Sequence, residues 1–340
     1  MNVMNAIGTI EVRGIDHVDF WVGDAQRAAA DLVDGFGFRI QPEPDRSDPR
    51  TVLVTQGGIR LRLVAPAAPG DEVAEFVARH GDGVAVIALL VEDAAAAHAQ
   101  AVERGAVPVT PTGTSAPAVA GFGDVALSFL DRPAAGPAPD PADLLQELDH
   151  VAVCVPAGEL ERTTVFCEQV LGLRRIFTNY IDIGTQGMDS TVVQSPSGAV
   201  TFTFLEPDTT REPGQIDGFL SAHGGVGVQH LAYRTDDIAL AVSTFQKQGV
   251  EFLTTPSRYY DAIEARLGPP VIALEQLREL NLLVDHDHGG QLFQIFTRSA
   301  HPLGTYFTEL IERRGASTFG TANITALYEA IARRQSVPSS

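Results

Sequence analysis

Apolar and polar positions alternate along this chain in short segments, and the same order of segments occurs twice. Short runs rich in Val, Ile, Leu and Phe predict strands, whereas apolar residues three or four positions apart predict helices. In the first half, strands are expected at 18–22, at 51–65 around a Gly57-Gly58 turn, at 84–91 and at 125–130, with helices at 24–35 and 92–105.

The second half repeats this order and extends it. Its predicted strands are 151–155, 190–194, 200–205, 228–234 and 292–297, and its predicted helices are 159–171 and 237–249. The extension comprises helices at 259–267 and 273–280, an aromatic strand at 305–311 and a last helix that begins at Asn323, a favoured N-cap residue. That helix carries Ile324, Leu327, Tyr328 and Ile331 on one face. We expect it to cover the second half as a lid.

The two halves share a sequence signature near their starts. Residues 15–18 read Ile-Asp-His-Val, and residues 148–151 read Leu-Asp-His-Val. Further along, Val86 in the first half stands where His230 stands in the second. We therefore expect an α+β fold of two tandem βαβββ-repeat modules that form open barrels, with a C-terminal lid helix. The predicted domains are 12–133 and 148–335, joined by a proline-rich linker at 134–147.

Composition and charge limit the partners. The 340 residues are 44% hydrophobic and 20% charged, as in folded proteins. A net charge of -19 argues against nucleic acid and against an anionic membrane surface. No apolar run reaches the roughly 20 residues of a membrane span, and residues 1–13 lack the pattern of an export signal. With only two cysteines, a disulfide framework is excluded and a cytoplasmic location is expected. The oligomeric state stays open, a homodimer included.

Two of the nine histidines stand out. His150 and His230 lie in apolar strands, where a buried imidazole must be hydrogen-bonded or bound to a metal, because an unpaired buried polar group costs about 1–3 kcal/mol. Two core histidines held only by hydrogen bonds are the alternative. His17 has the same local sequence as His150 but lacks a second histidine, so we expect it to be structural. The other six histidines sit in helix or loop contexts without a partner at metal spacing.

A carboxylate would complete a site for a dioxygen-activating iron, because two histidines and one carboxylate leave three positions open. Glu309 is the best candidate. It alternates with Phe307 and Ile311, so the pleat of the strand puts it on the apolar face. Glu312 falls on the opposite face and is expected to be solvated.

Four segments of the second half carry a family resemblance. They are 228–232 (Val-Gln-His-Leu-Ala), 292–297 (Leu-Phe-Gln-Ile-Phe-Thr), 307–313 (Phe-Thr-Glu-Leu-Ile-Glu-Arg) and 319–324 (Phe-Gly-Thr-Ala-Asn-Ile). They resemble signature segments of the 4-hydroxyphenylpyruvate dioxygenase family, and still more closely its branch that forms 4-hydroxymandelate. The resemblance covers nearly the whole chain. It implies the vicinal-oxygen-chelate fold, with a degenerate first module and an iron-bearing second one.

The resemblance also implies roles for individual residues. The Fe(II) ligands would be His150, His230 and Glu309. Gln294 and Ser190 would orient the substrate, and Ile324 would select the product. The remaining residues implied to lie beside the substrate are Gln215, Gln229, Thr203, Phe296, Phe307, Phe319 and Asn323. For the phenylalanines, ordinary core packing is the alternative.

The implied substrates are 4-hydroxyphenylpyruvate and O2, and the implied products are 4-hydroxymandelate and CO2. Ile324 favours this branch, because the homogentisate-forming enzymes usually carry phenylalanine at that position. Asp189 departs from both branches. The alternatives are formation of homogentisate in tyrosine degradation, a non-catalytic ligand-binding protein of the same fold, and an extradiol dioxygenase or isomerase. The intact triad argues against the second alternative, and the C-terminal segment with Phe319 and Asn323 argues against the third.

Overall fold

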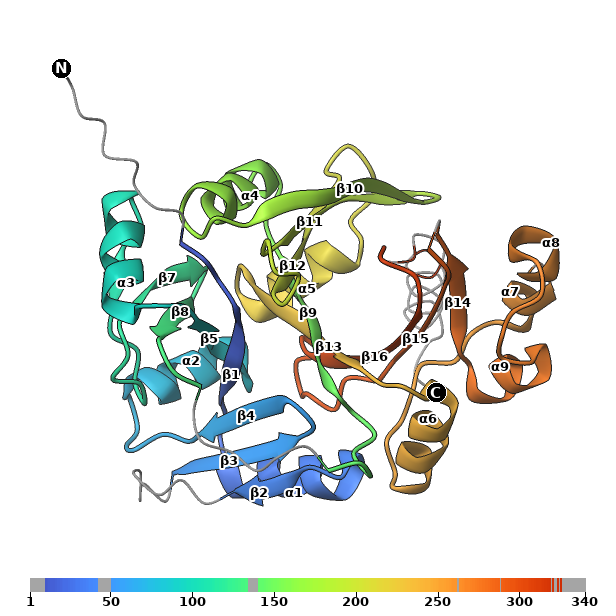
Figure 1. Ribbon diagram of the computed structural model, residues 1–340, viewed down its shortest axis with the longest axis horizontal. Helices are drawn as coiled ribbons and strands as arrows, with labels where there is room; N and C mark the ends of the chain where they lie inside the picture. Colours follow the sequence, from blue (N-terminus) through green and yellow to red (C-terminus); the bar gives the residue numbers. More distant parts are fainter. Residues whose placement is uncertain are drawn as a thin grey trace.

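The computed structural model describes residues 10–41, 50–133, 140–261, 263–287, 289–318, 320, 323 and 325. Its strands form two eight-stranded sheets, one in each half of the chain, which stand side by side (Figure 1). The predicted α+β architecture of two repeated modules is therefore confirmed. Among the described residues, no helix has both the length and the apolar character that crossing a membrane requires.

The first module contains eight strands and three helices within the described residues. Its strands are β1 (Gly14–Trp21), β2 (Arg39–Gln41), β3 (Thr51–Gln56), β4 (Ile59–Val64), β5 (Gly83–Leu90), β6 (Pro108–Val109), β7 (Ala118–Phe122) and β8 (Val125–Leu130). Its helices are α1 (Ala25–Phe36), α2 (Glu72–His80) and α3 (Ala94–Glu103). The strand order in the sheet is β2-β3-β4-β1-β5-β8-β7-β6.

The second module repeats this arrangement. Its strands are β9 (Glu147–Cys154), β10 (Arg174–Ile183), β11 (Gln186–Gln194), β12 (Thr201–Pro207), β13 (Gly227–Arg234), β14 (Leu283–His286), β15 (Gln291–Phe296) and β16 (Phe307–Arg314). Its helices are α4 (Leu160–Gln169), α5 (Gln215–His223), α6 (Ile238–Lys247), α7 (Ser257–Asp261), α8 (Ile263–Leu267) and α9 (Leu274–Leu280). The strand order is β10-β11-β12-β9-β13-β16-β15-β14, which is the first order with each strand replaced by its counterpart.

Each sheet is itself made of two βαβββ units. The first strand of a unit pairs in parallel with its last, as β1 does with β4 and β13 with β16. The two units of a module meet through an antiparallel pair, β1 with β5 or β9 with β13. Aspartates begin the crossover helices at equivalent places: Asp93 accepts the N–H of Ala96, and Asp237 accepts that of Leu240.

Several elements were not predicted from the sequence, namely strands β2, β6, β7, β10 and β14 and helices α2 and α5. Strand β10 lies at an edge of its sheet and is largely exposed, so it carries no apolar run that would mark it as a strand. Helices α2 and α5 connect the two units of each module, and each has only nine residues. The helix expected at 259–267 corresponds to α7 and α8, which lie on either side of residue 262, outside the described residues. Of the predicted lid, Asn323 and Thr325 are described and helical, and the rest lies outside the described residues.

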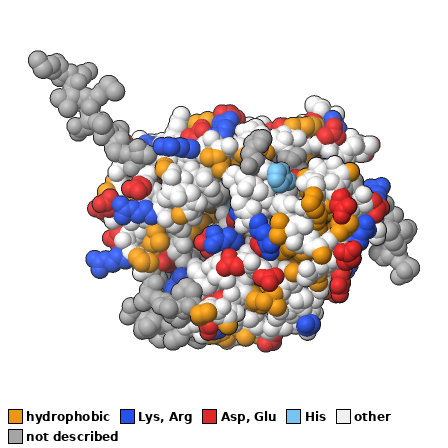
Figure 2. Space-filling view, turned by 45° about the vertical axis from the view of Figure 1, so that its right-hand side comes forward, with side chains coloured by type: hydrophobic (Ala, Val, Ile, Leu, Met, Phe, Trp, Pro, Cys, Tyr) orange, Lys and Arg blue, Asp and Glu red, His pale blue; other side chains and the backbone are white. Residues whose placement is uncertain are grey.

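The two modules contact each other through equivalent helices, because α2 packs on α5. Their last residues, His80 and His223, stack with ring centroids 4.3 Å apart and an interplanar angle of 21°. His80 Nδ1 lies 2.6 Å from the carbonyl oxygen of His223. On the face seen in Figure 2, acidic and basic side chains of the described residues are interspersed, without an extended basic patch of the kind that binds nucleic acid.

Candidate metal centre

Three neighbouring strands of the second sheet bring His150, His230 and Glu309 together. Ala232 on β13 pairs with His150 on β9 on one side and with Glu309 on β16 on the other. His230 lies two residues from Ala232 and therefore points to the same face. Ligand atoms of the three residues lie within 4.8 Å of one another, and all three side chains are buried. No other cluster of this kind occurs among the described residues.

Hydrogen bonds fix the orientation of both imidazoles. Nδ1 of His150 lies 2.8 Å from Oδ1 of Asp149, and Nδ1 of His230 lies 3.2 Å from Oε1 of Gln229. Because both partners accept, each Nδ1 carries a proton, and Nε2 is the nitrogen that would bind a metal. These Nε2 atoms lie 3.5 Å and 3.4 Å from Oε2 of Glu309.

The buried carboxylate of Glu309 requires a positive charge close to it. Burial opposes ionisation of Glu309, yet His150 and His230 lower its pKa to about 2. Burial opposes protonation of His150, yet the carboxylates of Glu309 and Asp149 raise its pKa to about 9. A divalent cation would supply the same positive charge. Two imidazole nitrogens and one carboxylate oxygen are a donor set that fits Fe(II).

Asp149 contacts the centre through His150 but was not among the residues expected there. Arg313 donates to it twice, from Nε to Oδ2 at 2.7 Å and from a terminal nitrogen to Oδ1 at 2.8 Å. These bonds hold the pKa of Asp149 well below its usual range despite its burial. Such carboxylate–histidine pairs fix the ring that binds a metal. The repeated Asp-His pair at 16–17 and 149–150 was the available signal.

Several residues implied to contact substrate do lie at this centre. Gln294 donates from Nε2 to Oε1 of Glu309 at 2.7 Å and accepts from Nδ2 of Asn323 at 2.8 Å. The ring of Phe307 stacks on that of His230 at 4.8 Å and 22°. Phe296 stands edge-on to His230 at 6.3 Å. Two aromatic rings thus flank one side of the candidate metal site.

The other implied residues lie farther out or are placed differently. Thr203 on β12 is adjacent to Ala152 of β9, and its hydroxyl is buried without a hydrogen-bond partner among the described residues. Ser190 is buried on β11, between β10 and β12. Gln215 is the first residue of α5 and is half-buried. Gln229 positions His230, as described above. Phe319 and Ile324 lie outside the described residues.

The expectation that Glu312 is solvated was wrong. Its carboxylate is buried and accepts the backbone N–H of Ile238 at 2.9 Å. Ile238 is the first residue of α6, whose N-terminal N–H groups have no partner within the helix. The face opposite Glu309 is therefore covered by a helix, which strand alternation alone could not reveal.

The equivalent place in the first module holds an arginine. Register aligns Val86 with His230, Ser128 with Glu309 and Arg62 with Thr203. The guanidinium of Arg62 lies 3.1 Å from Nε2 of His17 and 3.1 Å from a carboxylate oxygen of Asp19. Our expectation that His17 is structural agrees with this contact.

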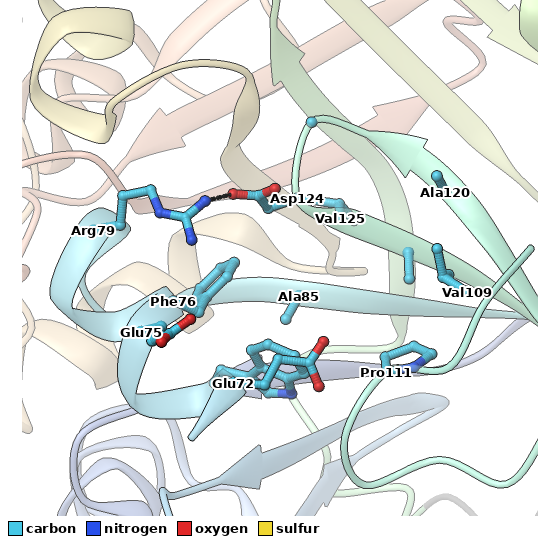
Figure 3. Close-up of a pocket in the computed structure, with 13 residues that line it drawn as sticks. Glu72, Glu75, Phe76, Arg79, Ala85, Val109, Pro111, Ala120, Asp124 and Val125 are labelled. Carbon is cyan, nitrogen blue, oxygen red and sulfur yellow. Dashed lines mark hydrogen bonds and ion pairs between the residues drawn. The ribbon is translucent and has the colours of Figure 1, made fainter. Parts of the chain in front are cut away.

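The first module also contains a cavity of about 340 Å³ on the concave side of its sheet (Figure 3). Helix α2 contributes Glu72, Glu75 and Phe76, and the facing strands contribute small apolar side chains such as Ala85. Arg79 at its rim pairs with Asp124. Histidine does not occur among the residues that line it. The cavity therefore has no counterpart of the triad.

Comparisons with known proteins agree with this geometry. Residues 5–138 match the family model described as hydroxyphenylpyruvate dioxygenase, N-terminal, and residues 149–264 match that of the glyoxalase/bleomycin resistance protein/dioxygenase superfamily. The chain is 31% identical to a 4-hydroxyphenylpyruvate dioxygenase of Dictyostelium discoideum, over 95% of this chain and 98% of that one.

Solved structures give the same result. A mutant 4-hydroxymandelate synthase from Streptomyces coelicolor superposes with a TM-score of 0.85 at 39% identity, over 96% of this chain and 99% of that one. The Mn(II)-bound glyoxalase from Novosphingobium aromaticivorans is similar in fold alone, with a TM-score of 0.53 at 13% identity over 89% and 83% of the two chains. By sequence, fold and the arrangement of His150, His230 and Glu309, the chain belongs to the 4-hydroxyphenylpyruvate dioxygenase family, within the vicinal-oxygen-chelate superfamily.

Proposed function

We propose that this chain is an Fe(II)-dependent enzyme that converts 4-hydroxyphenylpyruvate and O2 into 4-hydroxymandelate and CO2. The buried triad of His150, His230 and Glu309 is the observation that carries the proposal. The 39% identity to a 4-hydroxymandelate synthase supports the choice of product. The reaction balances, because one oxygen atom of O2 enters the new carboxylate and the other forms the benzylic hydroxyl.

Fe(II) held by these three side chains would chelate the α-keto acid and activate O2. The protein's own task is to keep the ligands fixed. Asp149 and Gln229 hold the imidazoles by their Nδ1 atoms. Gln294 holds Oε1 of Glu309, which leaves Oε2 directed at the histidines. Fixed ligands need little reorganisation on binding.

The substrate ring would lie against the aromatic side of the site. Phe307 and Phe296 are roughly perpendicular, with ring centroids 6.0 Å apart and an angle of 81°. They would exclude water and contact the phenol ring. Gln294 has one amide N–H beyond the bond to Glu309, and it would donate this N–H to an oxygen of the substrate. Ser190, Thr203 and Gln215 would line the more distant part of the pocket.

Product choice would depend on where the ring sits relative to the reacting oxygen. A displacement of about 1 Å is enough to redirect such chemistry. Ile324 is smaller than the phenylalanine usual in homogentisate-forming relatives, so it would leave room for the ring to turn and present its benzylic carbon. We expect Ile324→Phe to shift product toward homogentisate.

Anaerobic loading with Fe(II), followed by O2 and 4-hydroxyphenylpyruvate, tests the proposal. Chromatography should detect 4-hydroxymandelate and one CO2 per keto acid consumed. Homogentisate as the sole product would establish the dioxygenase alternative. Loss of substrate without either product, or no turnover at all, would refute both.

A further inference from the structure

We propose that Tyr259 is a positioning residue of the metal centre, because its hydroxyl satisfies the far end of a buried hydrogen-bond chain that runs through Asn323 and Gln294 to Glu309. The inference rests on the proposed function only in that Glu309 is taken as a metal ligand. Tyr259 lies on α7, in the segment that the second module has in addition to the first.

The chain consists of three hydrogen bonds. The hydroxyl of Tyr259 lies 2.9 Å from Oδ1 of Asn323. Nδ2 of Asn323 donates to Oε1 of Gln294 at 2.8 Å, and Nε2 of Gln294 donates to Oε1 of Glu309 at 2.7 Å. Asn323, Gln294 and Glu309 are at most 2% exposed, so water does not compete for these bonds.

The ionised carboxylate of Glu309 determines the direction of the chain, and the Tyr259 hydroxyl satisfies its other end. An ionised Glu309 can only accept, so Gln294 must turn its amide nitrogen toward it. The amide oxygen of Gln294 then requires a donor, which turns the nitrogen of Asn323 toward Gln294. The oxygen of Asn323 in turn requires a donor, and the Tyr259 hydroxyl lies within hydrogen-bond distance. Each side-chain amide therefore has one permitted orientation.

Backbone contacts leave the Tyr259 proton available for Asn323. The hydroxyl accepts the N–H of Val284 on β14 at 2.9 Å. The carbonyl of Val284 is an equally close acceptor for the hydroxyl, at 2.9 Å, but Arg266 also donates to this carbonyl at 3.0 Å, so it is not left without a donor. The fully buried Asn323 oxygen has the greater need for the proton, because an unsatisfied buried acceptor costs about 1–3 kcal/mol.

Without the Tyr259 hydroxyl, the buried oxygen of Asn323 would lose its donor, and the cost of an unsatisfied acceptor would oppose the orientation that Glu309 favours. A turned Asn323 would present its oxygen to the oxygen of Gln294. Gln294 would then turn as well and face the Glu309 carboxylate with its own oxygen. The expected result is a less fixed metal ligand, although Tyr259 lies three hydrogen bonds away from that carboxylate.

The test compares Tyr259→Phe with Tyr260→Phe. Tyr260 is the next residue of α7, is buried, and contacts Tyr259 edge-to-face at 5.1 Å, but its hydroxyl is not part of the chain. Fe(II) affinity is measured anaerobically by chelator competition without substrate, together with Tm. We expect Tyr259→Phe to weaken Fe(II) binding about three- to tenfold, and Tyr260→Phe to leave it at the wild-type value. Equal affinities in the two variants would overturn the proposal, whatever their Tm values.

A second variant tests the direction of the chain. Asn323→Asp keeps the shape of the side chain, but the ionised carboxylate can only accept. Gln294 would then donate to residue 323 and present its oxygen to Glu309, so at pH 8 we expect Fe(II) affinity to fall at least about tenfold. Wild-type affinity in this variant would contradict the proposed polarity. Both measurements omit O2 and keto acid, so a wild-type protein that binds Fe(II) without forming product would refute the proposed function and leave this inference standing.

Discussion

The first module has a buried centre around His17, and the second has one around His150. Each centre contains a buried carboxylate, but the charge of that carboxylate is balanced differently in the two. In both, an aspartate one residue earlier lies next to Nδ1, at 2.6 Å from His17 and 2.8 Å from His150. In both, Nε2 points into a site with a buried carboxylate, Asp19 or Glu309. A buried carboxylate is costly unless a cation is close to it. The two modules differ in which cation is available.

The first module supplies its cation from its own chain. Arg62 contacts both His17 and Asp19, and it stands at the register position of Thr203 in the second module. A guanidinium has no open coordination position and does not leave, so this centre can only stabilise the fold. Thr203 is too short to fill the equivalent space. Among the described residues, no arginine or lysine takes this place in the second module, where we propose that a metal ion binds.

We expect the largest effect, on Fe(II) affinity and turnover, from a substitution that changes only the second centre. Glu309→Gln should lower Fe(II) affinity and turnover by at least about a thousandfold, because a charged ligand is lost from a buried site. Ser128→Ala, at the equivalent register position of the first module, should leave both unchanged. Chelator competition and turnover assays measure the two quantities. Comparable losses in both variants would show that the first centre also takes part in metal binding.

Removal of the internal cation should affect stability and leave the metal centre intact. Arg62→Met leaves Asp19 buried beside His17, and we expect the free energy of unfolding to fall by about 3–5 kcal/mol, or Tm by roughly 6–20 °C. Thermal unfolding measures this loss, and Arg60→Met, whose guanidinium is 4.0 Å from Asp16, is the milder control. A large loss of Fe(II) affinity in folded Arg62→Met protein would show that Arg62 supports metal binding, contrary to the purely structural role expected for it.

Asp16 and Asp149, which precede His17 and His150, should differ in their effect on metal binding. Asp149→Asn should lower Fe(II) affinity about 10–100-fold, because this carboxylate orients a ligand imidazole. Asp16→Asn should change stability and leave metal binding unchanged, since His17 faces Arg62. The same competition assay serves both variants. Equal metal affinities for Asp149→Asn and wild type would show that Asp149 does not position His150 for metal binding.

The smallest effect concerns the contact between the modules. Burial, together with the neighbouring His80, lowers the pKa of His223 from 6.5 to about 4. The folded protein thus favours neutral His223, so its contribution is complete above pH 6.5 and is lost as the pH falls toward 4. We expect the free energy of unfolding to fall by on the order of 1–2 kcal/mol across that window. His223→Asn should flatten this part of the Tm profile, whereas His98→Asn should retain it.

The candidate metal ligands of the second module could be predicted because each stands out in a local sequence pattern. His150 and His230 stand out as polar residues in apolar strands, and Glu309 as a carboxylate on an apolar face. The pairing of Asp149 with Arg313 could not be predicted, because it joins residues 164 positions apart in the chain. The contact of Tyr259 could not be predicted for the same reason, since its partner Asn323 is 64 positions away. Glu312 was misjudged because α6 covers a face that strand alternation assigns to solvent.

Local patterns in the chain were enough to show a duplicated α+β protein whose second copy alone retains two strand histidines. Strand periodicity and repeated motifs are local, so no coordinates are needed to read them. Only the tertiary structure decided that Arg62 fills the first centre, that Asp149 and Gln229 orient the ligand imidazoles, and that a hydrogen-bond chain connects Tyr259 to Glu309. Each of these depends on the register and packing of strands distant in sequence, which a linear pattern does not specify.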